Sequence, residues 1–189
     1  SDGAMVLLDS GGQYIGGTTD VTRTFHTGIP TGYQKEMFTR VLKGNIGLDT
    51  QIFPAGTPGC LLDSFAREHL WKGGKDYLHG TGHGVGAALN VHEGPQRISR
   101  VLDKQPLMEG MVVSNEPGYY EDGNFGIRIE NLLTVINKSE TFSGRAFLGF
   151  EKLTMIPIQH KCMDFELLTP KEIEWIDRYH AEKLHRVKS

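Results

Sequence analysis

The stretch GTGHGVGAALNVHEGP, residues 80–95, places histidines in a run so rich in glycine that a regular helix is disfavoured. His79, just before it, and His83 have the spacing that puts two side chains on one face of a helix, as in helical zinc pairs. Each glycine in a helix interior costs about 1 kcal/mol, so the alternating glycines argue against that arrangement. We predict an irregular strand or loop, whose glycines permit close backbone approach and let His83 reach a crowded centre.

Two aspartates flank a glycine-rich turn near the start of the chain. Residues 5–8 and 18–25 are rich in apolar or β-branched side chains, and the glycines between them predict a hairpin. A symmetric turn about residues 14–15 would pair Asp9 with Asp20. Like charges directly opposite destabilise a ladder, so this pair favours a cation between them. Taken alone, Asp9 is equally typical of a turn cap and Asp20 of a solvated strand position.

A second predicted hairpin carries two glutamates. Its strands are expected at 111–114 and 126–135, joined by a connection rich in Pro, Gly and Asn. Glu116 follows the first strand directly before a proline, where a carboxylate can project into a cleft. In GIRIENLLTV, the alternation places Arg128 and Glu130 on the face opposite the isoleucines. An exposed strand end and a surface ion pair explain these residues equally well when each is taken alone.

The remaining pattern predicts helices at three places. Apolar residues recur with helical spacing over 33–42 and 61–71, and TPKE at 169–172 is a capping box with proline at the first helical position. Strands and helices follow no strict βαβ order. We therefore predict an α+β fold with mostly antiparallel strands.

Length and composition narrow the class of protein. The 189 residues fit one domain, and a formal net charge of -3 gives no basic excess for nucleic acid or a membrane surface. No apolar run approaches the ~20 residues of a membrane helix. Cys60 and Cys162 lie far apart without a CxxC pair, so we expect a reducing, cytoplasmic setting.

Four stretches together resemble the catalytic domain of aminopeptidase P, the Xaa-Pro aminopeptidases of the pita-bread metallopeptidase family: DSGGQYIGGTTDVTRT, LHGTGHGVGAALNVHEGPQRIS, NEPGYYEDGNFGIRIEN and LTPKEIEWIDRYH. The resemblance implies a creatinase/aminopeptidase-like fold, a curved, mostly antiparallel sheet flanked by helices. Residues 1–189 would form a metallopeptidase catalytic domain that is incomplete at its N-terminus, since the family has further elements and a substrate-contacting histidine upstream.

The resemblance also implies a two-metal site with five ligands, namely Asp9, Asp20, His83, Glu116 and Glu130. Asp20 and Glu130 would bridge the two ions. Asp9 would hold one ion, and His83 with Glu116 would hold the other. A ligand set dominated by oxygen with one imidazole favours Mn²⁺, the metal to which the family also points, while Zn²⁺, Co²⁺ and Fe²⁺ stay open.

The implied reaction is hydrolysis of the peptide bond before a proline in the second position. A metal-bridging hydroxide would attack the carbonyl, and Glu116 would carry the proton to the departing nitrogen. By resemblance, His79 and His92 contact substrate and steady the tetrahedral intermediate without binding metal. Arg128 would hold a ligand carboxylate, with a plain ion pair as its alternative.

Two other functions stay open. Prolidase, which cleaves Xaa-Pro dipeptides, is the enzymatic alternative, although the run NVHEGPQRIS resembles the cytosolic type of aminopeptidase P. A non-catalytic pita-bread binding module is the other, against which the presence of all five ligand types argues. We expect peptide substrates, no nucleic-acid or membrane partner, and either a homodimer or association with the missing N-terminal portion.

Overall fold

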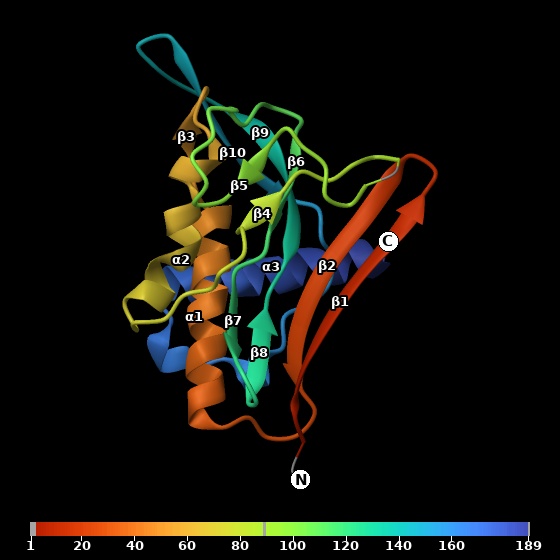
Figure 1. The fold of residues 1–189 in the computed structure, drawn as a ribbon, viewed down its shortest axis with the longest axis vertical. Coiled ribbons are helices and arrows are strands. Elements are labelled where there is room, and N and C mark those ends of the chain that lie inside the picture. Colours follow the sequence, from red (N-terminus) through yellow and green to blue (C-terminus); the bar gives the residue numbers. More distant parts are fainter. Residues whose placement is uncertain (1–2, 89, 189) are drawn as a thin grey trace.

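Two long antiparallel strands at the start of the chain form a ribbon that stands out from the rest of the protein (Figure 1). The computed structural model describes residues 3–88 and 90–188. The ribbon strands are β1 (Met5–Tyr14) and β2 (Gly17–His26). Only Ile15 and Gly16 separate them, and Gly16 has a φ of 94°, a left-handed conformation that glycine adopts without a Cβ penalty.

The register of this ribbon differs from the predicted one by two residues. Asp9 pairs with Thr22, and Asp20 pairs with Gly11, so the predicted direct pairing of the two aspartates is wrong. The turn is centred one residue later than the symmetric expectation, because the position with positive φ falls on Gly16. Side chains in a strand alternate with a period of two, so a shift of two leaves both carboxylates on one face.

The central sheet has four antiparallel strands in the spatial order β3-β10-β9-β6. Their bounds are β3 (Phe53–Pro54), β10 (Arg145–Lys152), β9 (Asn131–Phe142) and β6 (Val112–Asn115). Two smaller sheets pair β4 (Gly82–His83) with β5 (Arg97–Ile98), and β7 (Gly118–Glu121) with β8 (Phe125–Arg128). Every strand pair in the described residues is antiparallel, which confirms the predicted α+β class.

The second predicted hairpin is interrupted where the sequence suggested a continuous strand. The strand predicted over 126–135 is divided into β8 and β9, and the predicted connection contains strand β7. Pro117 has no N–H to donate to a ladder, which favours a break at this point. The hairpin therefore belongs to two sheets, with β6 and β9 in the central one and β7 and β8 in the small one.

The register continues unchanged across this interruption. Asn115 pairs with Asn131 on one side of it, and Arg128 pairs with the first residue of β7 on the other. Glu116 and Glu130 consequently occupy facing positions inside the gap. The break removes both residues from the regular ladder, so their side chains are available for a common site.

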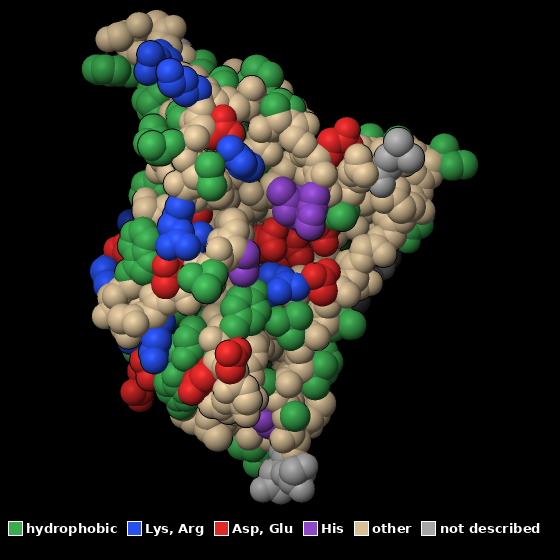
Figure 2. Space-filling view, in the orientation of Figure 1, with side chains coloured by type: hydrophobic (Ala, Val, Ile, Leu, Met, Phe, Trp, Pro, Cys, Tyr) green, Lys and Arg blue, Asp and Glu red, His purple; other side chains and the backbone are tan. Residues whose placement is uncertain are grey.

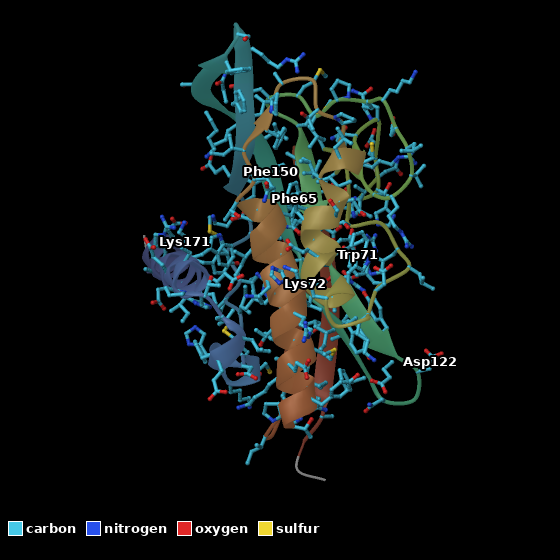
Figure 3. The ribbon with its side chains drawn as sticks, turned by 90° about the vertical axis from the view of Figure 1, so that its left-hand side faces the viewer. Phe65, Trp71, Lys72, Asp122, Phe150 and Lys171 are labelled. Carbon is cyan, nitrogen blue, oxygen red and sulfur yellow. The ribbon has the colours of Figure 1, made fainter. Side chains whose placement is uncertain are left out.

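Three α-helices pack around the sheets (Figures 1 and 3). Their bounds are α1 (Gly32–Asp49), α2 (Asp63–Trp71) and α3 (Pro170–Lys188), with short 3₁₀ turns at Gly59–Leu61, His160–Cys162 and Phe165–Leu167. Helix α3 begins at the predicted capping box, where Glu172 accepts from the Thr169 N–H at 2.7 Å. The predicted helix over 33–42 extends to Asp49. None of the described helices is both long and apolar enough to cross a membrane.

Helix α1 connects two groups of buried side chains. Phe38 and Val41 pack with residues of β8 and α3 in one group, and Leu48 packs with the central sheet and α2 in the other. Figure 3 shows α1 and α2 lying over one face of the protein, with Phe65, Trp71 and Lys72 along α2. This packing fixes the sheets on which the ligand candidates stand.

Candidate metal centre

A hollow of about 410 Å³ lies where the ribbon meets the interrupted hairpin. Figure 2 shows acidic side chains gathered inside it, with histidines on one side and basic side chains on the other. Its lining combines the five predicted ligands with neighbours from the ribbon and the glycine-rich loop: Asp9, Gly11, Gly12, Gln13, Thr18, Thr19, Asp20, His83, Val91, His92, Glu116 and Glu130.

The five predicted ligands come from separate parts of the chain and converge here. Asp9 lies on β1, Asp20 on β2 and His83 on β4, while the two glutamates stand in the gap of the interrupted hairpin. Potential ligand atoms within 4.8 Å of one another form three overlapping groups in the described residues, and two of these consist of predicted ligands alone and share Glu130. These two groups are Asp9, Asp20 and Glu130, and His83, Glu116 and Glu130.

Glu130 is held at both its side chain and its backbone. The Thr22 hydroxyl donates to Glu130 Oε2 at 2.7 Å, and the Glu130 N–H donates to the Thr22 carbonyl at 3.1 Å. The Glu130 carbonyl accepts from the Arg23 guanidinium at 2.6 Å. Arg23 is buried and also donates to the Thr22 carbonyl. Strand β2 is thereby docked onto the interruption at the residue that both ligand groups share.

The histidine side of the hollow is organised by Ser114. Its hydroxyl accepts from the His83 N–H and donates to Glu116 Oε1, both at 2.9 Å. His83 Nδ1 lies 2.9 Å from the Gly84 carbonyl, to which it donates when that nitrogen carries the proton. In that tautomer, Nε2 carries a lone pair. This nitrogen faces the carboxylates, 3.4 Å from Asp20 and 3.2 Å from Glu116.

A chain of polar contacts runs from Asp9 to His79 along the basic side of the hollow. Arg128 donates to Asp9 Oδ2 at 2.6 Å, to the Thr22 hydroxyl at 3.1 Å and to the Tyr120 hydroxyl at 2.9 Å. The Tyr120 hydroxyl in turn lies 2.8 Å from His79 Nε2. Arg128 therefore orients a predicted ligand, and Tyr120 joins it to a predicted substrate histidine.

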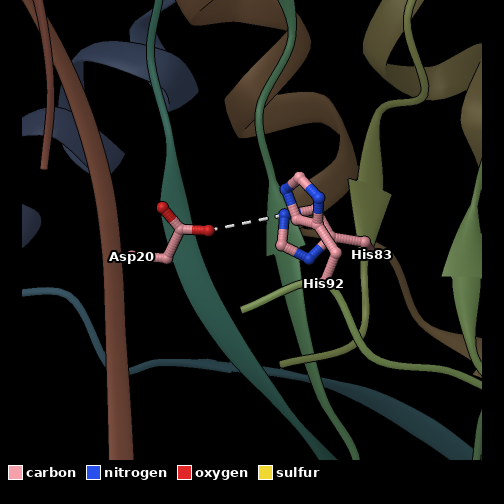
Figure 4. A group of neighbouring side chains, drawn as sticks. All are labelled: Asp20, His83 and His92. Atoms are coloured by element: carbon pink, nitrogen blue, oxygen red, sulfur yellow. Dashed lines mark ion pairs between the residues drawn. The ribbon is translucent and has the colours of Figure 1, made fainter. Parts of the chain in front are cut away.

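His92 lies closer to the predicted ligands than its predicted substrate role requires. Its ring centroid is 4.2 Å from that of His83, and Figure 4 shows the two rings together facing Asp20. One nitrogen of His92 lies within 4.8 Å of ligand atoms of Asp20 and His83. His79 is not among the residues that line the hollow and lies beside Tyr120, so the two predicted substrate histidines stand apart from each other.

The electrostatics of the hollow are those of crowded negative charge. Burial raises the pKa of Glu130 to about 8, and repulsion from Glu116, Asp20 and Asp9 adds to the shift. Burial alone would lower the pKa of His83, but hydrogen bonds with Asp20 and Glu116 outweigh it and raise that pKa to about 10. The crowded carboxylates thus favour the protonated forms of Glu130 and His83.

This donor set fits divalent metal ions. Four carboxylates and one imidazole gather in two overlapping groups, which matches two neighbouring ions that share a bridging carboxylate. Carboxylate oxygens with a single imidazole suit manganese and other ions of intermediate hardness better than thiolate-seeking ones. Two ions would neutralise the charge that otherwise raises the pKa of Glu130.

Three residues of this site were missed from the sequence: Thr22, Ser114 and Tyr120. A signal for the first two was present, because Thr22 follows Asp20 by two positions and Ser114 precedes Glu116 by two. In a strand, that spacing places two side chains on the same face. Tyr120 offered no such signal, since it meets His79 only through the packing of β7 against the glycine-rich loop.

Comparisons with known proteins bear on the fold and the family. Residues 1–137 match the model of metallopeptidase family M24, and residues 146–189 match the C-terminal region of peptidase M24. Aminopeptidase P2 of Arabidopsis thaliana is 61% identical over 187 residues, covering 97% of this chain and 26% of the relative. A probable Xaa-Pro aminopeptidase P of Arthroderma gypseum is 57% identical over 183 residues, covering 95% and 29%. The chain thus spans less than a third of the length of these relatives.

Solved structures agree with these matches. The X-prolyl aminopeptidase of Caenorhabditis elegans, a cytosolic enzyme with a di-nuclear active site, superposes with a TM-score of 0.92 at 44% identity, covering 96% of this chain and 30% of that one. Prolidase from Pyrococcus furiosus superposes at 0.66 with 35% identity, covering 79% and 41%. These neighbours confirm the predicted pita-bread fold. The chain belongs to metallopeptidase family M24.

Proposed function

We propose that this chain is the catalytic part of a two-metal Xaa-Pro aminopeptidase. The observation that carries the proposal is the convergence of four carboxylates and one imidazole, from five separate places in the chain, around one hollow. The high identity to relatives named aminopeptidase P supports the same activity. The ions would be Mn²⁺, which this donor set favours.

Asp20 and Glu130 would bridge the two ions, with Asp9 at one of them and His83 with Glu116 at the other. The ions would supply Lewis-acid chemistry, polarising the scissile carbonyl and acidifying the attacking water. The buried Thr22 and Arg128 keep Glu130 and Asp9 in place, so the ligands need little rearrangement when the ions bind.

Glu116 would move the proton from the attacking water to the departing nitrogen of proline. Among the contacts of the described residues, Ser114 and His83 both meet its Oε1. This leaves Oε2 as the oxygen that takes up and releases the proton. The carboxylate is partly buried, with 17% of its side chain exposed, so bulk water competes little for that proton.

His79 and His92 would contact the substrate from two different places, His92 within the hollow and His79 beside Tyr120. His79 Nδ1 lies 2.8 Å from the Gly80 carbonyl and its Nε2 lies 2.8 Å from the Tyr120 hydroxyl, which fixes the ring plane. A donor held in that way can stabilise a developing negative charge without reorganising. His92 stands beside His83, where a peptide bound at the carboxylates would pass it.

Prolidase is the second candidate, because archaeal prolidases share the fold with this chain at 34–35% identity. One assay separates the two functions. Cleavage of a peptide beginning Arg-Pro-Pro is compared with cleavage of an Xaa-Pro dipeptide, each with added Mn²⁺. Preference for the tripeptide supports the aminopeptidase, and exclusive cleavage of the dipeptide supports prolidase. A chain that holds no stoichiometric metal and cleaves neither is a binding module.

We also propose that the free side of the ribbon is covered in the working enzyme, by a second copy or by further polypeptide of the kind that its longer relatives contain. Leu8 and Ile15 are exposed there, and an apolar cavity of about 430 Å³ lies between β2 and residues 153–156. Light scattering of the chain, alone and extended upstream, tests the proposal. A monodisperse monomer with the activity of the longer protein contradicts it. The cytoplasm is the proposed location.

A further inference from the structure

The acidic cluster has two halves that are supported in different ways. One half consists of Asp9, Asp20 and Glu130, and the other of His83, Glu116 and Glu130, with Asp20 also 3.4 Å from His83 at their junction. A buried hydroxyl stands beside each half, and each hydroxyl donates one hydrogen bond to a carboxylate while accepting another from an N–H group. The two hydroxyls differ in which ligands they reach.

Among the hydrogen bonds of the described residues, the Ser114 hydroxyl reaches only residues that belong to the His83 half. Ser114 is fully buried on β6, and its hydroxyl accepts from the His83 N–H and donates to Glu116 Oε1. Gly82 makes this approach possible, because a Cβ at that position would lie 2.0 Å from the Ser114 carbonyl oxygen. The close crossing of β4 and β6 is thus built around this serine.

The hydroxyl couples the backbone of one candidate ligand to the side chain of the other. A hydroxyl has one proton, and the His83 N–H occupies an acceptor site on the oxygen, so the proton is directed toward Glu116. Both partners are largely buried, and water cannot readily replace a lost bond there. Without the hydroxyl, the Glu116 carboxylate loses the contact that orients it relative to His83.

Thr22 reaches the residue that both halves share. Its hydroxyl donates to Glu130 Oε2 and accepts from Arg128, which holds Asp9. A change at Thr22 therefore disturbs both metal positions, whereas a change at Ser114 disturbs one. Variants at Thr22 and Ser114 can therefore be compared with each other in the same protein.

We propose that Ser114 is a positioning residue that sets the affinity of the His83–Glu116 metal position and leaves the Asp9–Asp20 position unaffected. The proposal rests on the proposed two-metal site. Removal of the Ser114 hydroxyl therefore uncouples the two metal positions. At limiting metal concentration, such a variant keeps one ion and loses the other.

Calorimetric titration of the metal-free chain with Mn²⁺ tests this. In Ser114→Ala, we expect one of two binding steps to weaken about 10- to 100-fold, the usual effect of removing a group that orients a ligand, with the other step unchanged. Ser114→Thr, which keeps the hydroxyl, restores the affinity. Equal weakening of both steps, or no change in either, overturns the proposal.

Co²⁺ identifies the position that is lost. A Co²⁺ ion ligated by His83 shifts the resonance of that imidazole N–H in the proton NMR spectrum, and His92→Ala removes the signal of the neighbouring ring. In Ser114→Ala, the shifted His83 resonance should appear only at higher Co²⁺ concentration than in the parent chain. Its appearance at the same concentration contradicts the proposal.

Two further variants serve as controls. Thr22→Val should weaken both steps. Thr39→Val removes a buried hydroxyl that also donates and accepts, to the Lys35 carbonyl and from the Asp164 N–H, away from the hollow, and should change neither step. Thermal unfolding checks that each variant folds, and Ser114→Cys replaces Ser114→Ala if the latter does not. A parent chain that binds fewer than two ions contradicts the proposed function itself, whereas two ions with an unchanged Ser114→Ala titration contradict only this inference.

Discussion

Two partly buried clusters of charged side chains in this protein differ in their balance of positive and negative groups. On α2, the fully buried Arg67 contacts Asp63 at 2.6 Å and Asp76 at 2.9 Å, and it also donates to the carbonyls of Tyr77 and His79. In the hollow, four carboxylates face the imidazoles of His83 and His92, and among the ion pairs of the described residues Arg128 reaches only Asp9. The first cluster balances its charges, and the second has more carboxylates than cations.

The pKa shifts follow from this difference. Burial opposes ionisation in both clusters, but the hydrogen bonds that Arg67 donates to Asp63 raise the pKa of Arg67, and the one that it donates to Asp76 lowers the pKa of Asp76, which favours the charged forms. In the hollow, burial and neighbouring carboxylates raise the pKa of Glu130 to about 8. A cluster whose charges are balanced stabilises the fold, and one with more carboxylates than cations indicates a site for positive ions.

The largest effect is expected at the proposed proton carrier. Glu116→Gln removes the group that would carry the proton. We therefore expect kcat to fall by about 10²- to 10⁴-fold, the usual contribution of a general acid or base. Substrate binding, measured by calorimetry at saturating Mn²⁺, should remain detectable. An unchanged kcat would remove Glu116 from the mechanism.

The next effect concerns metal content. Asp20→Asn or Glu130→Gln should lower the bound metal below two equivalents per chain, because a bridging carboxylate neutralises both ions and an amide neutralises neither. Elemental analysis after dialysis against a low metal concentration measures this. Asp122→Asn, in the loop between β7 and β8, is the control and should keep the parent stoichiometry. Two full equivalents in either ligand variant would contradict the ligand assignment.

For the cluster around Arg67, the expected effect of a substitution is a loss of stability. Arg67→Met leaves the buried Asp63 without its cation, whereas Asp76 keeps its ion pair with Arg100, and breaking a buried pair costs about 3–5 kcal/mol in the free energy of unfolding. Arg97→Met breaks the partly exposed ion pair with Asp103 and should cost at most about 1 kcal/mol. Denaturant unfolding compares them. Equal losses in the two variants would show that burial of the ion pair does not govern its contribution.

The smallest effect is a pH dependence of the metal-free chain. Glu130 has a folded pKa of about 8, above its ordinary 4.5, so the folded state is progressively destabilised as pH rises from about 4.5 to 8. His83 has a folded pKa of about 10, so its contribution is complete below about 6.5 and is lost as pH rises toward 10. Both groups predict the same direction of change. In the presence of a chelator, the free energy of unfolding should decrease from pH 6 to pH 9. Saturating Mn²⁺ should abolish this decrease. A free energy of unfolding that increases with pH in the presence of chelator would contradict the charge imbalance.

Much of the site was accessible from residue types and spacing. The glycines around His83 excluded a helical zinc pair, and alternation in GIRIENLLTV placed Glu130 and Arg128 on one face, as observed in their shared contact with Thr22. The predicted ribbon register failed by two residues because a symmetric turn was assumed and the left-handed position falls on Gly16. The continuous strand over 126–135 failed because the backbone leaves one sheet and enters another there.

The sequence by itself determined the face to which each strand carboxylate points, because side-chain alternation has a period of two and survives a register error of two. It also determined the start of α3 and, through the family resemblance, the residues proposed as ligands. Only the tertiary structure decided which hydroxyls hold those ligands and that Tyr120 meets His79. These contacts join residues from different sheets and loops, and their distances depend on how β2, β4 and the interrupted hairpin pack together, which no local pattern in the chain encodes.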